Sequence, residues 1–194
     1  MGLLKSALYW HQTQDAMAKA IFFDRDGTLI DEPSGEGTVN EWNLFKLKPD
    51  LASLKELEQD GYLFFIVTNQ PALSTGRLSR DFYDQSNEAL LKSLPITIEK
   101  IFTCPHTKDT PCTCRKPQAV AVPQMIAEYG IEPGDSYTVG DRRSDVELGR
   151  RYGLRTILVS NPHLDQGDIR PDYFADNLAQ AVRYIISNEH GQRL

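Results

Sequence analysis

Short runs of apolar, β-branched and aromatic residues recur along the chain and predict strands. They occupy residues 20–23 (AIFF), 62–67 (YLFFIV), 98–103 (IEKIFT), 136–140 (SYTVG) and 154–160 (LRTILVS). Within these runs, apolar side chains follow one another with little polar interruption. This is typical of strands that are covered on both faces. The hydrophobic pattern therefore indicates a parallel sheet.

Amphipathic stretches separate the predicted strands. Leucines at three-residue spacing predict a helix over residues 50–60, and a second helix is predicted over 79–94, where a proline follows. Two further helical patterns end at Tyr129 and Tyr152, each directly before a glycine. The alternation of strands and helices predicts a doubly wound, Rossmann-like α/β domain. In such sheets the ligand binds outside the carboxyl ends of the strands.

The composition fits one ordinary globular domain. The chain has 194 residues, of which 40% are hydrophobic and 25% are charged. We expect residues 19–194 to form a single domain. An N-terminal extension, residues 1–18, precedes it and has no assigned role.

Charge and hydropathy argue against two classes of partner. The formal net charge is −6, so we expect no long-range attraction to nucleic acid or to an anionic membrane. No stretch approaches the ~20 consecutive apolar residues that a membrane span requires, and the first residues lack the apolar core of a signal peptide. We expect a cytoplasmic, monomeric protein.

All three cysteines of the chain fall within eleven residues and share this segment with a histidine. The pattern C-x-H-x5-C-x-C predicts a closed tetrahedral Zn²⁺ site with the ligands Cys104, His106, Cys112 and Cys114. With four protein ligands the zinc would be structural, and it would stiffen the loop 104–114 that leads into Arg115 and Lys116. The alternative is a group of reduced surface thiols beside a chance histidine.

Polar side chains directly follow several of the predicted strands. Asp24 and Asp26 come after the first strand, and such a pair suits a divalent cation, a nucleophile and a proton-transfer group. Thr68 and Asn69 follow the second strand and have the groups to hydrogen-bond phosphate oxygens. Taken singly, these residues are equally compatible with a solvated turn and with helix caps.

Two further segments have similar candidates. Asp141 follows the fourth strand, and Asp145 comes four residues later. Lys116 would supply fixed positive charge in an otherwise acidic protein. The alternative for the aspartates is an N-cap followed by a charged helical turn.

Four segments together resemble the motifs of the haloacid dehalogenase superfamily of phosphohydrolases. They are FFDRDGTLI, VTNQ, CRKP and VGDRRSD, in this order and each at a predicted strand end or loop. The resemblance covers roughly residues 20–160, and four ordered motifs are far more specific than any one of them. It implies a Mg²⁺-dependent phosphomonoesterase that acts on a small phosphorylated metabolite.

The resemblance also implies a role for each candidate residue. Asp24 would be the nucleophile that forms an aspartyl-phosphate, and Asp26 would protonate the leaving oxygen and later accept a proton from water. Mg²⁺ would be held by the Asp24 side chain, the Asp26 backbone carbonyl and Asp141. The phosphate and substrate would be bound by Thr68, Asn69, Arg115 and Lys116. Asp145 would orient Lys116 or a metal-bound water.

A zinc loop followed by CRKP is similar to one branch of the superfamily. This branch contains the D-glycero-D-manno-heptose 1,7-bisphosphate phosphatases and the histidinol-phosphate phosphatases, which lack a large cap domain. The motif spacing here likewise leaves no room for one. A chain of this length resembles the heptose enzymes, whereas FFDRDGTLIDEP and GDRRSD look closer to the histidinol type.

The loop 70–77 departs from the S-G-I-x-R-G pattern of the heptose enzymes, with Thr75 in the expected arginine position. Arg77 is a candidate for the second positive charge, and Trp42 for a residue at the substrate mouth. We expect the 7-phosphatase reaction on heptose 1,7-bisphosphate, with histidinol phosphate as the alternative substrate. A non-catalytic zinc-stabilised binding module is a third hypothesis, disfavoured because the catalytic residue set is complete.

Overall fold

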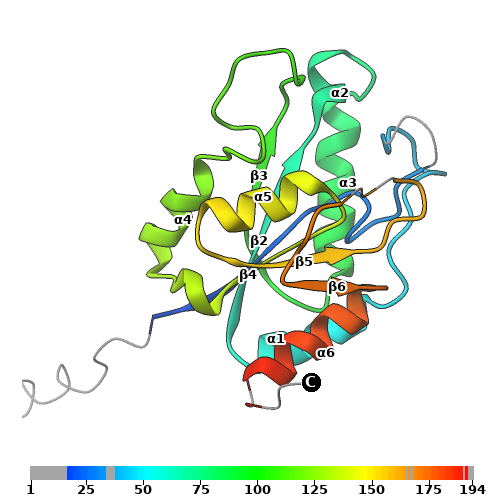
Figure 1. The fold of residues 1–194 in the computed structure, drawn as a ribbon. Helices are drawn as coiled ribbons and strands as arrows, with labels where there is room; N and C mark the ends of the chain where they lie inside the picture. Colours follow the sequence, from blue (N-terminus) through cyan, green and yellow to red (C-terminus); the bar gives the residue numbers. More distant parts are fainter. Residues whose placement is uncertain (1–16, 34–37, 165, 167, 190, 192–194) are drawn as a thin grey trace, which may run out of the picture.

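A computed structural model describes residues 17–33, 38–164, 166, 168–189 and 191. Its centre is a six-stranded parallel sheet in the order β3-β2-β1-β4-β5-β6 (Figure 1). The strands are β1 (Lys19–Phe23), β2 (Tyr62–Asn69), β3 (Ile98–Cys104), β4 (Tyr137–Gly140), β5 (Arg155–Val159) and β6 (Tyr173–Ala175). The sequence predictions of a parallel sheet and of its first five strands are thus confirmed.

The strand order reverses at β1, which pairs with β2 on one side and with β4 on the other. The chain builds β2 and β3 outward from β1, and then returns to add β4, β5 and β6 on the opposite side. At such a reversal the loops after adjacent strands diverge and leave a crevice at their carboxyl ends. The ends of β1 and β4 are therefore the expected place for a ligand.

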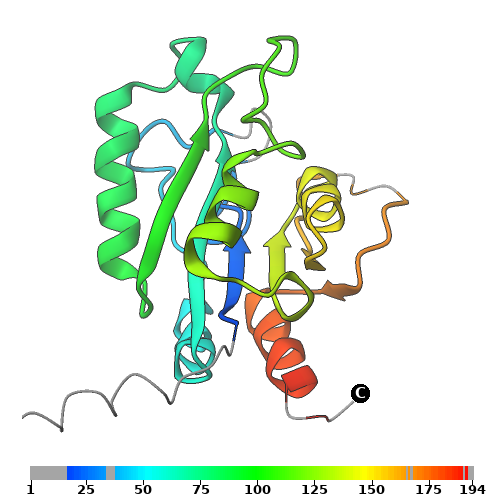
Figure 2. The same ribbon diagram turned by 90° about the vertical axis from the view of Figure 1, so that its left-hand side faces the viewer.

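Helices cover both faces of the sheet (Figure 2). They are α1 (Leu54–Gln59), α2 (Pro71–Ser74), α3 (Arg80–Ser93), α4 (Ala121–Tyr129), α5 (Arg143–Arg151) and α6 (Leu178–Glu189), with 3₁₀ turns η1 (Leu51–Ser53) and η2 (Pro133–Asp135). The predicted helices over 50–60 and 79–94, and those ending at Tyr129 and Tyr152, correspond to η1 with α1, to α3, to α4 and to α5. Sequence analysis did not predict β6 and α6.

Alternating side chains of the central strands point to opposite faces of the sheet and pack into two hydrophobic cores. Ile21 and Phe23 of β1 belong to the core that includes residues of α1, α3 and α6. Ala20 and Phe22 belong to the second core, under α4 and α5. Because both faces are buried, the strands need apolar residues at nearly every position, which explains their uninterrupted apolar runs.

The long loops place polar residues at one edge of the sheet, and their described residues form no inserted domain. Among the described residues, only η1, α1 and loop segments lie between β1 and β2, and only α2, α3 and short loops lie between β2 and β3. The expectation of a fold without a large cap agrees with this. Of the expected extension 1–18, residues 1–16 lie outside the described part of the chain. No described helix combines the length and apolar character needed to cross a bilayer.

The centre of the sheet predicts a large difference between two phenylalanine truncations. Phe65 is fully buried, stacks on Phe22 at 5.0 Å and meets the Tyr129 ring edge-on, whereas Phe174 of β6 is 49% exposed. Phe65→Ala should lower the free energy of unfolding by about 3–5 kcal/mol, because it leaves a cavity between sheet and helix. Phe174→Ala, the control, should change it by ~0.5 kcal/mol. Equal losses in urea unfolding would contradict this account of the core.

Candidate active site

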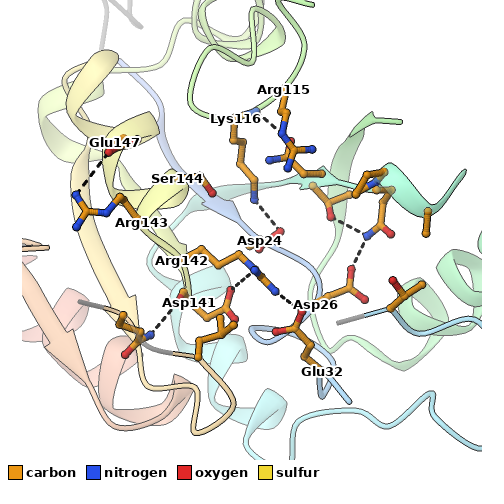
Figure 3. Close-up of a pocket in the computed structure, with 18 of the residues that line it drawn as sticks. Asp24, Asp26, Glu32, Arg115, Lys116, Asp141, Arg142, Arg143, Ser144 and Glu147 are labelled. Carbon is orange, nitrogen blue, oxygen red and sulfur yellow. Dashed lines mark hydrogen bonds and ion pairs between the residues drawn. The ribbon is translucent and has the colours of Figure 1, made fainter. Parts of the chain in front are cut away.

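Polar side chains at the carboxyl edge of the sheet surround a cavity of about 560 Å³. It is lined by Asp24, Asp26, Glu32, Thr38, Thr68, Asn69, Gln70, Pro71, Ala72, Arg77, Arg115, Lys116, Asp141, Arg142, Arg143, Ser144, Glu147, Leu164 and Gln166. Asp24 directly follows β1 and Asp141 directly follows β4, the two strands at which the sheet reverses. The structure therefore brings together the predicted residues Asp24, Asp26, Thr68, Asn69, Arg115, Lys116 and Asp141. Figure 3 labels Asp24, Asp26, Arg115, Lys116 and Asp141.

Lys116 is a buried cation between two carboxylates. Its Nζ lies 2.7 Å from Oδ1 of Asp24 (Figure 3) and 2.6 Å from Oδ1 of Asp145, and the residue is only 4% exposed. Burial alone would lower the pKa of Lys116, but the two carboxylates raise it to about 12. The lysine is therefore permanently charged and fixed beside the Asp24 carboxylate.

The ends of β1 and β4 concentrate negative charge. Carboxylate oxygens of Asp24, Asp141 and Asp145 lie within 4.8 Å of one another, and all three residues are buried. Burial, together with the charges of Asp24 and Asp145, raises the pKa of Asp141 to about 8. Lys116 alone does not neutralise three buried carboxylates, and the nearby Arg142 is shared between Asp141 and Glu32. The remaining negative charge would stabilise a further cation at this site.

Asp141 also has a free ligand atom. Its Oδ1 is buried and has no hydrogen-bond partner among the residues that the structure describes, and Nε of Arg142 lies 3.9 Å away. The backbone at Gly27 lies very close to this side chain, because a Cβ at Gly27 would lie 2.1 Å from Oδ2 of Asp141. Glycine at this position, with φ +85°, is therefore required. The unpartnered oxygen and the hard oxygen donors fit Mg²⁺.

Asp26 differs from the other aspartates because its side chain is held from both sides. Nη1 of Arg25 donates to Oδ1 of Asp26 at 3.0 Å, and Nε2 of Gln70 donates to Oδ2. Gln70 also donates to Oγ1 of Thr68 at 2.9 Å. The Asp26 side chain is thus not part of the carboxylate cluster formed by Asp24, Asp141 and Asp145.

A second network, which sequence analysis missed, supports Asp141. Nδ2 of Asn161 donates to Oδ2 of Asp141 at 2.6 Å and to Oε2 of Glu32 at 3.0 Å. Glu32 also accepts a hydrogen bond from Arg142. Burial raises the pKa of Glu32, and the Arg142 charge opposes this effect. Asn161 follows β5 directly after Ser160, so its place after a predicted strand was the available signal.

The four predicted zinc ligands converge on one point. Sγ of Cys104 lies 3.8 Å from Sγ of Cys112, 3.7 Å from Nδ1 of His106 and 3.2 Å from Sγ of Cys114. A zinc ion at the usual Zn–S distance of about 2.3 Å keeps its tetrahedral ligands about 3.8 Å apart. The cluster therefore fits a closed structural zinc site with three thiolates and one imidazole.

The cysteine loop is tied to the cavity at several points. Nη1 of Arg115 donates to the His106 carbonyl at 2.9 Å, and the Lys116 backbone N–H donates to Oδ1 of Asn69 at 3.0 Å. The Gln70 N–H donates to the Cys104 carbonyl at 2.7 Å. These bonds tie the loop to the positions of Arg115 and Lys116, two of the cationic residues that line the cavity.

Arg77 lines the cavity, as its candidacy for substrate binding requires. Trp42 does not line it. Its ring packs edge-on against Phe45 at 5.6 Å and Phe82 at 5.0 Å. Trp42, a candidate for the substrate mouth, thus packs against these two aromatic rings and is not among the residues that line the cavity.

Comparison with known proteins identifies the family. The chain is 33% identical over 183 residues to D-glycero-beta-D-manno-heptose-1,7-bisphosphate 7-phosphatase of Pasteurella multocida, covering 87% of this chain and 97% of the relative. The chain belongs to the haloacid dehalogenase-like phosphatases. The family model described as HAD-hydrolase-like matches residues 113–181.

Other relatives agree with this assignment. The chain is 34% identical over 168 residues to Histidine biosynthesis bifunctional protein HisB of Buchnera aphidicola, covering 84% of this chain and 47% of the relative. The chain thus spans less than half the length of this relative. The fold matches the crystal structure of D,D-heptose 1.7-bisphosphate phosphatase from B. bronchiseptica complexed with magnesium and phosphate. The TM-score is 0.76 at 23% identity, over 88% of this chain and 99% of the other.

The raised pKa of Asp141 predicts that the charge cluster destabilises the folded protein more at high pH than at low pH. Without a bound cation, the ionisation of Asp141 does not reduce the free energy of unfolding below the unfolded-state pKa of about 4. It reduces this free energy progressively as the pH rises toward the folded-state pKa of about 8. Asp141→Asn should therefore raise the Tm of the metal-free protein at pH 8 and leave it nearly unchanged at pH 4. Asp109→Asn, an exposed carboxylate, is the control.

Mg²⁺ should raise the Tm of the unsubstituted protein at pH 8, because it binds only the folded state, and should have little effect on the Asp141→Asn variant. A melting temperature that does not rise on substitution at pH 8 would show that the cluster carries no such cost.

The cysteine cluster predicts about one zinc ion per chain by elemental analysis. Cys112→Ser should reduce the zinc content and lower kcat/KM for phosphomonoesters by about 10-fold, because the loop positions Arg115 and Lys116. Thr113→Ser, at an exposed position between two cysteines, should change neither quantity. Purified protein that contains no zinc and still has full activity would rule out the site.

Proposed function

We propose that this protein is a Mg²⁺-dependent phosphomonoesterase that acts through an aspartyl-phosphate at Asp24. The observation that carries the proposal is the buried pairing of Asp24 with Lys116 at 2.7 Å, beside the unpartnered Oδ1 of Asp141. The Asp24 carboxylate lies where the strand order of the sheet reverses, next to a fixed cation and to an oxygen that can bind a metal. Such a carboxylate is suited to receive a phosphoryl group.

The proposed reaction has two steps. A carboxylate oxygen of Asp24 attacks phosphorus, and the bond from phosphorus to the substrate oxygen breaks while Asp26 gives that oxygen its proton. Asp26, now ionised, then takes a proton from the water that attacks the phosphorus of the aspartyl-phosphate. This second step releases inorganic phosphate and restores both carboxyl groups.

The surrounding residues would bind the phosphoryl group. Lys116, Thr68 and Asn69 would contact its oxygens, and Lys116 would be held in place by Asp145. Mg²⁺ would be held by the Asp24 carboxylate, the Asp26 backbone carbonyl and Asp141, and when bound it would offset the repulsion between the phosphate dianion and Asp24. Zn²⁺ in the Cys104–Cys114 loop would be structural.

The preferred substrate is D-glycero-D-manno-heptose 1,7-bisphosphate, hydrolysed at the 7-phosphate. The heptose 7-phosphatase relative matches the chain over 97% of its own length. The cavity also offers a cation for a second anionic group. Arg115 is anchored to a neutral carbonyl, and it has no carboxylate within 4.0 Å in the described part of the chain. In a bisphosphate, the second phosphate group could bind Arg115 while Lys116 binds the first.

Histidinol phosphate is the second candidate substrate. The chain is similar to HisB proteins at 32–34% identity. The buried Glu32 on the cavity wall is also an anionic partner for the amino group of such a substrate. Against this, Glu32 already has Arg142 and Asn161 as partners.

Kinetics with both substrates test the proposal. With Mg²⁺, kcat/KM should be higher for heptose 1,7-bisphosphate than for histidinol phosphate, and turnover should be lost in EDTA and in Asp24→Asn. Arg115→Gln should lower kcat/KM for the bisphosphate by about 10-fold or more, because it removes one charge-assisted contact, and should affect histidinol phosphate far less. Arg151→Gln, on the exposed side of α5, is the control.

A preference for histidinol phosphate, unaffected by Arg115→Gln, would overturn the substrate assignment and keep the phosphatase. Full turnover of either ester by Asp24→Asn would overturn the phosphatase mechanism itself.

A further inference from the structure

Arg25 is an unusual residue for its place in the molecule. It lies between two active-site aspartates in sequence, yet its side chain is 1% exposed and points into the packing between β1 and α3. Burying a cation is costly unless every N–H group has a partner. Its partners therefore indicate what the buried charge is for.

The Arg25 guanidinium is held by α3. Its Nε donates to Oδ1 of Asn87 at 2.9 Å, its Nη2 donates to Oγ of Ser86 at 2.7 Å, and it lies 5.3 Å from the centre of the Tyr83 ring. The remaining Nη1 donates to Oδ1 of Asp26 at 3.0 Å. Three contacts thus fix the planar fork, and the fourth is directed at an active-site carboxylate.

Helix α3 has no direct access to the reaction. All of its residues are described, and none of them lines the cavity. Arg25 is thus the link by which Ser86 and Asn87 reach the cavity wall. Because a guanidinium has N–H donors and no acceptor atom, this link can only donate a hydrogen bond to Asp26.

We propose that Arg25, anchored by Asn87, is a positioning residue that holds the Asp26 carboxyl group in the orientation needed for proton transfer to the leaving oxygen. Gln70 fixes the other oxygen of the same carboxyl group. The inference rests on the proposed phosphatase function and adds to it a requirement that reaches from the cavity into α3. It does not depend on the identity of the substrate.

The test uses leaving groups that differ in their need for a proton. Alkyl phosphates, which include both candidate substrates, depend on general acid catalysis, because an alkoxide leaves poorly. p-Nitrophenyl phosphate releases a stabilised phenolate and needs little proton donation. Asn87→Leu removes the acceptor for Nε at similar volume, whereas Asn87→Asp keeps an acceptor oxygen.

Asn87→Leu should lower kcat for the better alkyl substrate by about 10-fold or more and that for p-nitrophenyl phosphate by less than about 3-fold, with KM nearly unchanged. Asn87→Asp should restore the alkyl activity. Gln85→Ala, on the exposed side of α3, should match the unsubstituted protein with both esters. If Asn87→Leu fails to fold in a thermal melt, Arg25→Lys provides the same comparison, because it keeps the charge and loses the fork.

Equal losses with the two esters, or no loss with either, would overturn the positioning role and leave the phosphatase assignment intact. An unsubstituted protein that hydrolyses neither ester would instead overturn the proposed function, and this inference with it.

Discussion

The mutual repulsion of buried carboxylates at the end of β1 and β4 is the constraint on which the site depends. Asp24, Asp141 and Asp145 approach within 4.8 Å of one another, and burial makes their charges interact strongly. Lys116 compensates part of this charge, and Asp141 keeps an unpartnered oxygen. A divalent cation resolves the remaining imbalance, which is why the proposed Mg²⁺ site follows from electrostatics as well as from family membership.

The topology of the sheet brings this charge cluster together. Parallel pairing of β1 with β4 brings the residues after both strands to the same edge of the sheet. Lys116 reaches them from the loop after β3, and its backbone N–H is hydrogen-bonded to Asn69 at the end of β2. The cysteine loop and the carboxylate cluster are therefore parts of one assembly, in which the proposed zinc would set the position of the compensating cation.

Much of this was predictable from sequence, because the signals are local. Apolar runs gave the first five strands, and residues that follow them, such as Asp24 and Asp141, lie at the site as expected. The C-terminal helix α6 was missed even though Leu178, Ala181, Val182 and Ile185 have helical spacing and are buried. The strand before it, β6, has only three residues, which give almost no periodic signal.

The supporting residues could not be predicted in the same way. From the sequence, Arg25 is a charged residue in a polar motif, with nothing to indicate burial. Only the structure shows that it is buried against α3. Gln70 and Asn161 likewise have roles that depend on partners 44 and 20 residues away in the chain. The amide and guanidinium groups that orient a site are chosen by three-dimensional neighbours, which no local pattern encodes.

Trapping the covalent intermediate is the most direct test of the central claim. The enzyme would be mixed with excess alkyl phosphate and Mg²⁺, quenched in acid during turnover, reduced with borohydride and digested for peptide mass spectrometry. Reduction converts an aspartyl-phosphate into homoserine, and the account predicts homoserine at position 24 and at no other aspartate. Homoserine at another position, or phosphate release during turnover with position 24 unmodified, would contradict it.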